Sequence, residues 1–307
     1  MVHSKFLHIL LFSCIFVLLN GCEHEEIDHT QLVVEGWIDA GKHPIVLLHT
    51  SYSLNESKEP DNTTLMDVLA EHIVAFGKVV LFDGKDSVIL TGRLDTNYLS
   101  PSIYTTTKII GEIGKTYTIH ASFKEYSTSS TTKIPTMATM DSIRVIQSNN
   151  KMNIIGYANK LEVGEPYILM ARTTDQRQYK ICPMGAFRAT APYMAITINN
   201  PLDFTGEGAM LQTLFPKTDS VEISIKFAHV GEAEFQMWDG YIAQNMTQGM
   251  FFMETHSNIL SNISGGNGYW CGMGASEYII EPDEEKLMKE WKEKEKRLKT
   301  CLIIQKR

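Results

Sequence analysis

Tyr117-Thr118-Ile119-His120-Ala121-Ser122-Phe123 is the stretch that decides the fold class of this chain. Its apolar side chains alternate with polar ones, and a period of two is typical of a β-strand with one buried and one solvated face. His120 falls on the polar face, so we expect this histidine to be solvated rather than catalytic. The alternation predicts that the first half of the chain is built from β-sheet.

Further short strands are predicted at residues 32–38, 44–49, 78–83 and 87–91. Gly84 and Lys85 separate the last two of these strands and predict a hairpin turn. The polar stretch 51–70 predicts a long loop with a short helix near residues 64–71. This spacing favours a β-sandwich of about 100 residues, immunoglobulin-like or transthyretin-like, that ends in a linker at 134–136.

The second half is also rich in predicted strands, which lie at residues 142–146, 152–157, 167–172 and 221–227. From residue 232 to 248 the apolar positions change to a helical period, and Phe235, Trp238 and Ile242 form one stripe. The glycine-rich stretch 258–272 lacks the lysine of a phosphate-binding P-loop. We therefore interpret it as a structural turn beside a strand edge.

The C-terminal tail carries a separate pattern. Pro282 is followed by three acidic residues and then by Glu-Lys pairs spaced four residues apart. This pattern predicts a charged helix in the tail 282–307. Two interpretations stay open: a solvated terminal helix that Trp291 docks onto the body, or a helix that pairs with a partner.

The N-terminus reads as a signal peptide. Residues 6–19 form an apolar run after Lys5 that is short for a membrane span and typical of a signal-peptide core. The run ends in Leu19-Asn20-Gly21-Cys22, where a small residue directly before a cysteine is the lipobox pattern. We predict cleavage before Cys22 and lipidation of its thiol, which anchors the chain in a membrane. The alternative is an ordinary secretory signal that happens to contain a cysteine.

The residues that follow Cys22 are acidic and include Glu23, Glu25 and Glu26. This cluster resembles the surface-export signal of lipoproteins in the Bacteroidota phylum. The resemblance implies a lipid-anchored outer-membrane protein that faces the cell exterior. A solvated flexible tether would have the same composition, and the two interpretations are compatible.

These patterns predict a mainly β fold with two β-sandwich-like domains, the second with helical insertions and a C-terminal charged helix. The predicted parts are a signal peptide (1–21), an acidic tether (22–30), an N-terminal β-sandwich (31–135), a C-terminal β-rich domain with a helix near 232–248 (136–281) and the charged helical tail (282–307). The apolar fraction of 43% is enough for packed cores. The net charge of −8 argues against nucleic acid as a partner.

Three cysteines, Cys182, Cys271 and Cys301, remain after the signal peptide and the lipidated residue are set aside. One disulfide is expected in an oxidising compartment, and Cys182 with Cys271 is the candidate pair. The spacing does not match zinc ligands, and the motifs of common nucleophiles, metal sites and nucleotide sites do not occur. We therefore predict no catalytic residues, no metal and no cofactor.

The candidate ligand contacts are the aromatic pair Tyr269 and Trp270 beside the glycine-rich stretch. Aromatic rings can stack on sugars or on aromatic ligands when they are exposed. Trp37 and Trp238 are expected to pack in the core, so Trp270 is the tryptophan that we expect at the surface.

Three stretches carry a family resemblance, namely Leu32–Ile38, the segment from Thr91-Gly92-Arg93 to Gly111-Glu112-Ile113-Gly114-Lys115-Thr116-Tyr117, and Ser261-Asn262-Ile263-Ser264-Gly265-Gly266-Asn267-Gly268. Over roughly residues 22–280 the chain resembles a family of Bacteroidota outer-membrane lipoproteins known as a domain of unknown function, the DUF4249 type. The chain departs from that family at Tyr269-Trp270-Cys271 and in its charged tail. The resemblance implies a role beside a TonB-dependent transporter and supplies no catalytic residues.

The same phylum O-glycosylates Asp-Ser-aliphatic triplets, so the resemblance also implies candidate sites at Ser87, Ser142 and Ser220. The alternative is that Asp-Ser is turn chemistry before a strand.

We therefore expect a surface-exposed outer-membrane lipoprotein that is a non-enzymatic binding or accessory component of a TonB-dependent nutrient uptake system. Its expected partners are the outer membrane, through the lipid anchor, and a TonB-dependent transporter. Two alternatives stay open: a surface hydrolase that acts on peptide or glycan, and an adhesin-like structural subunit.

Overall fold

The computed structural model describes residues 30–51, 70–98, 100–148, 151–173, 177, 179–199, 222–247 and 260–280. The predicted signal peptide, the tether up to residue 29 and the tail 282–307 lie outside these residues. So does most of the helix predicted near 64–71. The description below concerns the compact unit that begins at Gln31.

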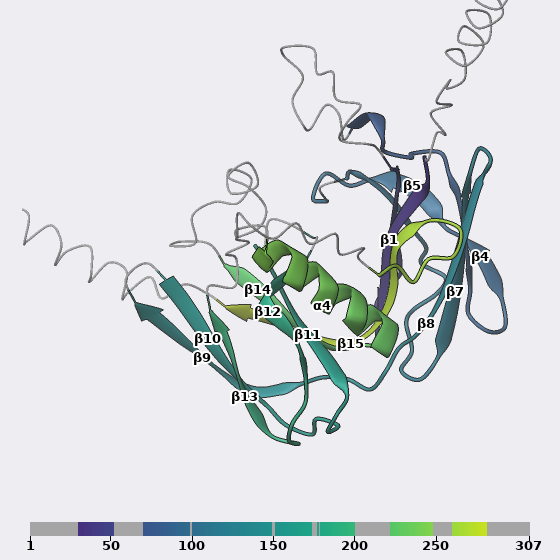
Figure 1. Ribbon diagram of the computed structural model, residues 1–307. Helices are drawn as coiled ribbons and strands as arrows, with labels where there is room; N and C mark the ends of the chain where they lie inside the picture. Colours follow the sequence, from purple (N-terminus) through teal and green to yellow (C-terminus); the bar gives the residue numbers. More distant parts are fainter. Residues whose placement is uncertain are drawn as a thin grey trace, which may run out of the picture. The chain divides into compact units, whose positions relative to one another are not determined.

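β-strands make up most of the described residues (Figure 1). In chain order the elements are β1 (Leu32–Asp39), β2 (Ile45–Thr50), β3 (Lys78–Phe82), β4 (Ser87–Ile89), β5 (Thr91–Leu94), β6 (Ser102–Thr105), β7 (Thr116–Phe123), β8 (Tyr126–Lys133), β9 (Met140–Ser148), β10 (Lys151–Ala158), β11 (Pro166–Thr173), β12 (Lys180–Arg188), β13 (Met194–Asn199), β14 (Ile223–His229), α4 (Glu232–Thr247) and β15 (Asn267–Ile280). The prediction of a mainly β fold is confirmed. Each predicted strand is present, with ends that differ by a few residues.

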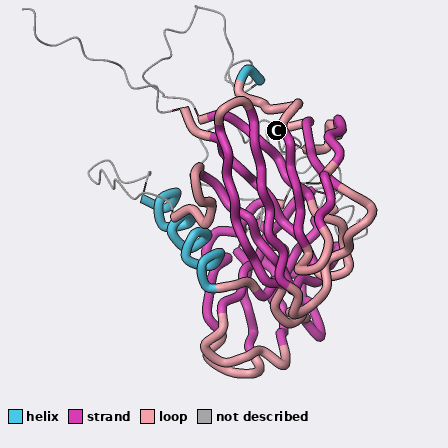
Figure 2. The backbone as a smooth tube through the Cα atoms, turned by 90° about the vertical axis from the view of Figure 1, so that its right-hand side faces the viewer, coloured by secondary structure: helices cyan, strands magenta, loops and turns pink. Residues whose placement is uncertain are grey.

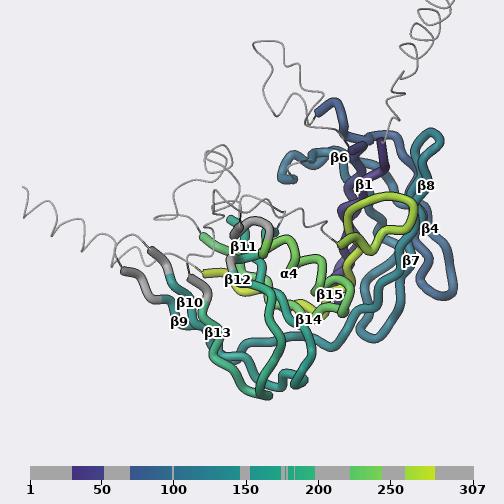
Figure 3. The backbone as a smooth tube through the Cα atoms, in the orientation of Figure 1, coloured from purple at the N-terminus to yellow at the C-terminus, as the bar shows by residue number. Residues whose placement is uncertain are grey.

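Within the described residues these strands form three sheets, which can be followed along the chain in Figure 3. The largest has the order β12-β11-β14-β15-β1-β2-β6-β5, the second β4-β3-β7-β8 and the third β13-β10-β9. β15 joins the two halves of the largest sheet. Its first half runs parallel to β1, and its second half runs antiparallel to β14.

Both smaller sheets pack on the same face of β15. Side chains alternate along a strand, so Trp270 and Ile280 point to the same side of the sheet. Trp270 belongs to an apolar cluster with Leu81 of β3 and Ile119 of β7. Ile280 belongs to a second cluster with Ile154 of β10. One long strand is therefore part of the wall of two cores.

Glycines in the middle of β15 let another segment of the chain cross it at short range. A Cβ at Gly272 would lie 2.9 Å from the backbone of Lys133, and a Cβ at Gly274 would overlap the carbonyl oxygen of Thr136. Only a residue without a side chain allows such an approach. The linker predicted at 134–136 therefore passes directly over β15.

The opposite face of the largest sheet carries α4, the cyan helix along one side of the strands in Figure 2. Trp238 and Ile242 of the helix pack against Met170 of β11 and against Cys271 and Met273 of β15. The helix predicted for residues 232–248 is confirmed from Glu232 to Thr247, the last residue described there.

The apolar clusters divide nearly where the sequence places the boundary between residues 31–135 and 136–281. The first contains residues from Leu32 to Ile134, together with Ile263 and Trp270, and the second begins at Ala138. The largest sheet nevertheless continues across the boundary through β15. The division into two domains stays a prediction.

The strands β6, β8, β12 and β13 were not predicted, and the predicted strand 87–91 reaches only the first residue of β5. The expected turn at 258–272 is wrong from residue 267 onward, where β15 begins. β8 is rich in serine and threonine, so it lacks an apolar face. Its inward hydroxyls are buried and hydrogen-bonded instead: Ser130 donates to the carbonyl of Asn262 at 2.7 Å. Hydrogen bonding can replace apolar burial when every buried polar group finds a partner.

Candidate functional site

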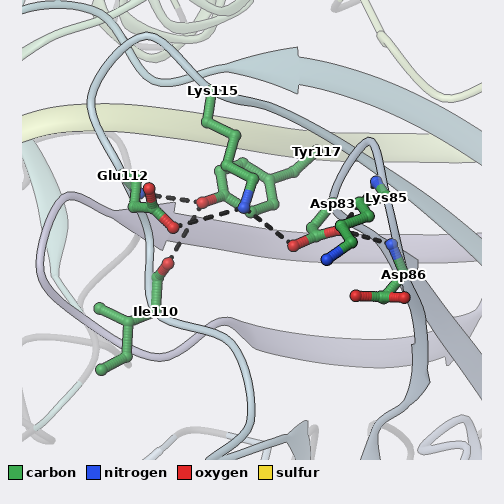
Figure 4. Close-up of polar contacts among 7 residues, drawn as sticks. All are labelled: Asp83, Lys85, Asp86, Ile110, Glu112, Lys115 and Tyr117. Carbon is green, nitrogen blue, oxygen red and sulfur yellow. Dashed lines mark hydrogen bonds and ion pairs between the residues drawn. The ribbon is translucent and has the colours of Figure 1, made fainter.

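The motif at residues 111–117 holds a turn in place through its polar side chains (Figure 4). The Tyr117 hydroxyl accepts a hydrogen bond from the amide of Glu112 at 2.9 Å and donates one to the carbonyl of Ile110 at 3.2 Å. The Lys115 ammonium donates to Asp83 at 2.9 Å and to Glu112 at 3.3 Å. The motif thus ties the start of β7 to the β3–β4 turn, and its polar groups serve the fold.

The charges of this turn stabilise one another. Amide hydrogen bonds from Asp86 and Lys85 and the ammonium of Lys115 lower the pKa of the Asp83 carboxyl, and Asp83 in turn raises the pKa of Lys115. Burial raises the pKa of the Tyr117 hydroxyl. At neutral pH the ion pair is therefore charged, and the tyrosine keeps the proton that it donates.

The same turn occurs a second time in the chain. Residues 162–167, Glu-Val-Gly-Glu-Pro-Tyr, repeat the pattern Glu-aliphatic-Gly-x-x-Tyr of residues 112–117, Glu-Ile-Gly-Lys-Thr-Tyr. The Tyr167 hydroxyl accepts a hydrogen bond from the amide of Glu162 at 2.9 Å. A tyrosine that fixes the backbone a few residues upstream is a recurrent device of β-sandwiches, where it is called a tyrosine corner.

The two corners share further backbone geometry. Gly114 and Gly164 have positive φ angles of 82° and 89°. The amide of Gly114 donates to Ile134 at 2.7 Å, and that of Gly164 donates to Ala189 at 2.8 Å. In each case the corner closes onto the end of the hairpin that follows it. A search for the repeated six-residue pattern would have found this duplication, which the sequence analysis missed.

The second motif, residues 261–268, caps the exposed edge of β15. The side-chain amide of Asn262 donates to the carbonyl of Trp270 at 2.8 Å, and its oxygen accepts from the amide of Trp270 at 2.9 Å. The Ser261 hydroxyl donates to the carbonyl of Gly268 at 2.9 Å. These side chains replace a neighbouring strand, so this motif also supports the fold.

The two predicted ligand contacts lie on opposite faces of β15. Trp270 is fully buried, and its indole N–H donates to the carbonyl of Tyr117 at 3.1 Å. The expectation that Trp270 is exposed is therefore wrong, because the ring fills the first apolar cluster. Tyr269 is partly buried on the α4 side, with its ring centroid 5.0 Å from that of Trp238. It stays a candidate contact.

Cys182 and Cys271 are free, buried thiols that belong to different apolar clusters. The expected disulfide between them is not formed, because β12 and β15 present the two side chains to opposite faces of the largest sheet. Burial raises the pKa of both thiols. Both thiols are therefore protonated and unreactive at neutral pH.

Two of the three candidate glycosylation residues are exposed. Ser87 opens β4, and Ser142 lies within β9. The remaining predicted residues fall outside the described part of the chain: Cys22, Glu23, Glu25, Glu26, Ser220 and Cys301.

A buried ion pair lies on the face of the largest sheet that carries α4. The Lys226 ammonium of β14 contacts the Asp39 carboxylate of β1 at 2.6 Å, and each side chain is only 3% exposed. Lys226 also lies 4.7 Å from the ring centroid of Tyr179. The pair links two strands that flank β15, so it joins the two halves of the sheet.

A second ion pair lies beside the buried pair of Lys226 and Asp39 and is more exposed than it. Lys42 donates to Glu277 at 2.5 Å. Burial opposes ionisation of Glu277, but the ammonium groups of Lys42 and Lys226 outweigh it and lower the pKa of the carboxyl. The Glu277 carboxyl is therefore ionised at neutral pH.

Arginines gather beside the end of β5. Arg177 and Arg93 contact the same carboxylate oxygen of Asp95, at 3.2 and 3.4 Å, and both guanidinium groups are about half exposed (55% and 52%). The Tyr98 ring lies 6.2 Å from that of Trp37 and is buried in a small apolar cluster beneath the arginines. Guanidinium groups bind carboxylate, sulfate and phosphate. We therefore regard Arg93 and Arg177 as the candidate binding site for an anionic group.

Glu35 and His49 lie on the same face, with a carboxylate-to-imidazole distance of 3.9 Å. Burial raises the pKa of Glu35. Burial and the neighbouring His72 lower the pKa of His49 to about 4. The imidazole is therefore neutral at physiological pH.

A protein-family model described as "Domain of unknown function (DUF4249)" matches residues 22–279. The chain belongs to the DUF4249 family. The family resemblance seen in the sequence is therefore confirmed.

The DUF4249 match begins at Cys22, the residue predicted to carry lipid, and ends within β15. Both structural motifs described above and the two tyrosine corners lie inside it. The charged tail from Pro282 onward lies beyond it.

No curated protein matches this DUF4249 chain. Among solved structures, a crystal structure of a DUF4785 family protein from Legionella pneumophila is similar at 9% sequence identity with a TM-score of 0.23. The alignment covers 67% of this chain and 54% of that chain, so the DUF4249 chain spans about half the length of that protein.

In the part of the DUF4249 chain that the structure describes, α4 is too short and too polar to cross a membrane, and no other helix there qualifies. The same residues contain no group of three or more His, Cys, Asp and Glu side chains that could hold a metal ion.

Proposed function

We propose that this DUF4249 protein is a surface-exposed outer-membrane lipoprotein and a non-enzymatic binding or accessory component of a TonB-dependent nutrient uptake system. The observation that carries the proposal is the lipobox: the family match begins at Cys22, the cysteine that the lipobox marks for lipidation. The acidic residues Glu23, Glu25 and Glu26 support exposure on the outer face of the outer membrane.

The use of charged side chains supports a binding scaffold rather than an enzyme. Asp39 and Lys226 form a buried pair, and Asp83 pairs with Lys115. The buried Glu234 of α4 accepts a hydrogen bond from Thr132 at 2.6 Å. Groups that could act as acids or bases thus hold elements together. The half-exposed arginines at Asp95 offer binding chemistry that needs no cofactor.

We further propose that the chain contains two β-sandwich-like domains, residues 31–135 and 136–281, followed by a charged helical tail at 282–307. The separate apolar clusters and the duplicated corner support the two domains. The Glu-Lys pairs after Pro282 support the helix.

The proposed location is tested with the full chain and a Cys22→Ser variant. We expect the native protein to incorporate labelled palmitate and to fractionate with the outer membrane, and the variant to do neither. Glu23→Gln, Glu25→Gln and Glu26→Gln together should leave lipidation intact but protect the protein from protease added to whole cells. A Cys22→Ser protein that still fractionates with the membrane would contradict the lipid anchor.

The partner is tested by affinity purification of the lipidated protein from outer membranes, with Cys22→Ser as the control. We expect a TonB-dependent transporter to be recovered with the native protein only. Repeated purification without a transporter would refute this part of the proposal.

A further inference from the structure

β5 is the last strand of the largest sheet, and in the part of the chain that the structure describes no strand pairs with its outer edge. All four of its residues are exposed, and Leu94 is 79% exposed. On the inner edge Arg93 lies opposite Ile103 of β6. The outer edge of such a strand offers N–H and C=O groups to another extended chain.

The register shows which backbone groups of β5 point outward. Residues bonded to the neighbouring strand alternate with residues that face away from it along an antiparallel strand. The amide of Asp95, directly after β5, donates to the carbonyl of Pro101 at 2.7 Å, so Arg93 also faces β6. The backbone groups of Gly92 and Leu94 therefore face away from the sheet.

Two guanidinium groups lie at the end of this edge, and one carboxylate holds them side by side. Arg93 and Arg177 contact the same oxygen of Asp95, at 3.4 and 3.2 Å. The other oxygen of Asp95 accepts hydrogen bonds from the amide and the side chain of Asn97, at 3.2 and 2.9 Å, which fixes the carboxylate. A guanidinium has five N–H groups, and one carboxylate oxygen cannot satisfy those of two arginines. The pair can therefore bind a further carboxylate.

A chain that pairs with β5 would bring its side chains against those of β5. Side chains directly opposite each other on neighbouring strands have Cβ atoms about 4.5–5.5 Å apart. A glutamate or aspartate opposite Arg93 would thus reach the two guanidinium groups. The residue opposite Leu94 would lie on the other face of the sheet, where an apolar side chain would cover this exposed leucine.

Other strand edges among the described residues are less suited to this pairing. Hydrogen bonds between Ser129 and Ser264 cover part of the edge of β8. The pairing of β12 with β11 is interrupted by a register shift, and Met184 of β12 has a positive φ of 54°. Such irregularities protect an edge from pairing. A second copy of this chain is also a poor partner for β5, because pairing of the two edges would bring four guanidinium groups together.

We propose that the outer edge of β5 binds an extended peptide segment of a partner protein, in which an acidic residue stands next to an apolar one. The segment adds a strand to the largest sheet through Gly92 and Leu94, and its carboxylate binds Arg93 and Arg177. This inference rests on the proposed role as a binding component, and it names the chemistry of the group that is bound.

The test uses the full lipidated protein in detergent and a fluorescent peptide of threonines with a central valine-glutamate-valine, and fluorescence anisotropy measures binding. We expect a probe with glutamine in place of glutamate to bind about tenfold more weakly, because it loses the ion pair. N-methylation of the two valine amides should also weaken binding about tenfold, because it removes hydrogen bonds to β5. N-methylation of the glutamate amide, which points away from β5, is the matched control.

The protein side of the contact is tested with Arg93→Gln and Arg177→Gln combined. We expect this double variant to bind the glutamate probe about tenfold more weakly and the glutamine probe as the native protein does. Arg144→Gln should bind both probes normally, because Arg144 is exposed on β9, an edge strand of another sheet. Equal urea midpoints would show that the variants are folded. The comparison of probes on the native protein does not depend on any variant.

Hydrogen exchange locates the bound peptide. Slower exchange of the amides of Gly92 and Leu94 in the presence of the glutamate probe would support strand addition. If methylation of the valine amides has no effect, or if inorganic sulfate or phosphate displaces the probe at equal concentration, the arginines bind an anion without strand addition and the inference is overturned. Native protein that binds no probe also overturns it. All of these outcomes leave the proposed function standing, which fails only if purification from outer membranes recovers no transporter.

Discussion

Tyr167 makes, 50 positions further along the chain (167 minus 117), the same bond that Tyr117 makes: each hydroxyl accepts a hydrogen bond of 2.9 Å from the amide five residues before it. In both places the tyrosine begins a strand that forms a hairpin with the next one, β7 with β8 and β11 with β12. The two halves of the protein therefore share a repeated unit of corner and hairpin.

Removal of either hydroxyl should destabilise the protein. Tyr117→Phe leaves the Glu112 amide and the Ile110 carbonyl without their partner, so we expect a loss of about 1–2 kcal/mol in the free energy of unfolding. Tyr167→Phe breaks the bond to Glu162 and should cost about 1 kcal/mol. Urea denaturation measures both values. Tyr193→Phe, at an exposed tyrosine, is the control and should have no effect; equal stability of all three variants would show that the corners contribute nothing.

The ion pair of Asp39 and Lys226 should be costly to break on one side only. Lys226→Met removes the 2.6 Å partner of the buried Asp39 carboxylate and leaves only Lys42 at 3.8 Å, so we expect a loss of about 3 kcal/mol. The double variant Lys226→Met with Asp39→Leu should recover most of this loss, since apolar side chains can replace a buried pair. Chemical denaturation of the single and double variants decides this. A double variant no more stable than the single one would contradict the argument.

The crossing of the linker over β15 predicts that Gly274 tolerates no side chain. Gly274→Ala places a methyl group against the carbonyl of Thr136, so we expect a loss of about 3 kcal/mol from overpacking. Gly240→Ala in α4 meets no atom within 4 Å and should be neutral or stabilising by up to about 1 kcal/mol. Thermal melts of the two variants give the comparison, and similar melting temperatures would argue against a tight crossing.

The two buried thiols should resist alkylation. Iodoacetamide at neutral pH is expected to leave Cys182 and Cys271 unmodified in the native protein and to modify both in denaturant, because burial raises the pKa of each thiol. Peptide mapping by mass spectrometry detects the modification. A peptide that joins the two residues by a disulfide would contradict the structure.

His49 should make stability fall in mild acid. The folded protein holds its pKa at about 4, below the ordinary value of 6.5, so the unfolded chain binds a proton that the folded chain refuses. Stability from the neutral imidazole is therefore lost as the pH falls from about 6.5 to about 4. In His49→Asn the fall over this range, measured by urea denaturation at each pH, should be smaller.

Glu35 should act in the opposite direction. Burial raises its pKa, so the folded protein takes up a proton more readily than the unfolded chain as the pH falls. Glu35→Gln removes this compensation and should make the acid-induced fall steeper than in the native protein. If stability falls with pH equally in His49→Asn, in Glu35→Gln and in the native protein, neither group contributes.

Periodicity predicted the strands in which one face is apolar, such as β1 and β7, and the helix over 232–247. It failed for β8, because serine and threonine fill that strand and their buried hydroxyls are paired by hydrogen bonds. It failed for the start of β15, because Gly268, Gly272 and Gly274 resemble turn residues when seen without the backbones that pass over them. Tertiary contacts decided both cases, and no local pattern encodes them.

Prediction of the candidate site from the sequence failed for the same reason. The glycine-rich motif suggested an exposed Trp270, but Asn262 occupies the strand edge beside it and the ring is enclosed by the first apolar cluster. The pairs of Asp39 with Lys226 and of Asp95 with Arg177 join residues far apart in the chain. Spacing in the sequence contains no signal for such pairs, so only the fold could bring them together.

The parallel pairing of β1 with β15 has a mechanical consequence. A pull through the residues before Leu32 acts along β1, which lies between β15 and β2 and is hydrogen-bonded to both. If the rest of the sheet is held, the hydrogen bonds of β1 to β15 and β2 are loaded in shear and resist together. The bonds of a terminal hairpin would instead break one at a time. The fold is thereby suited to bear tension that is applied through its N-terminal strand.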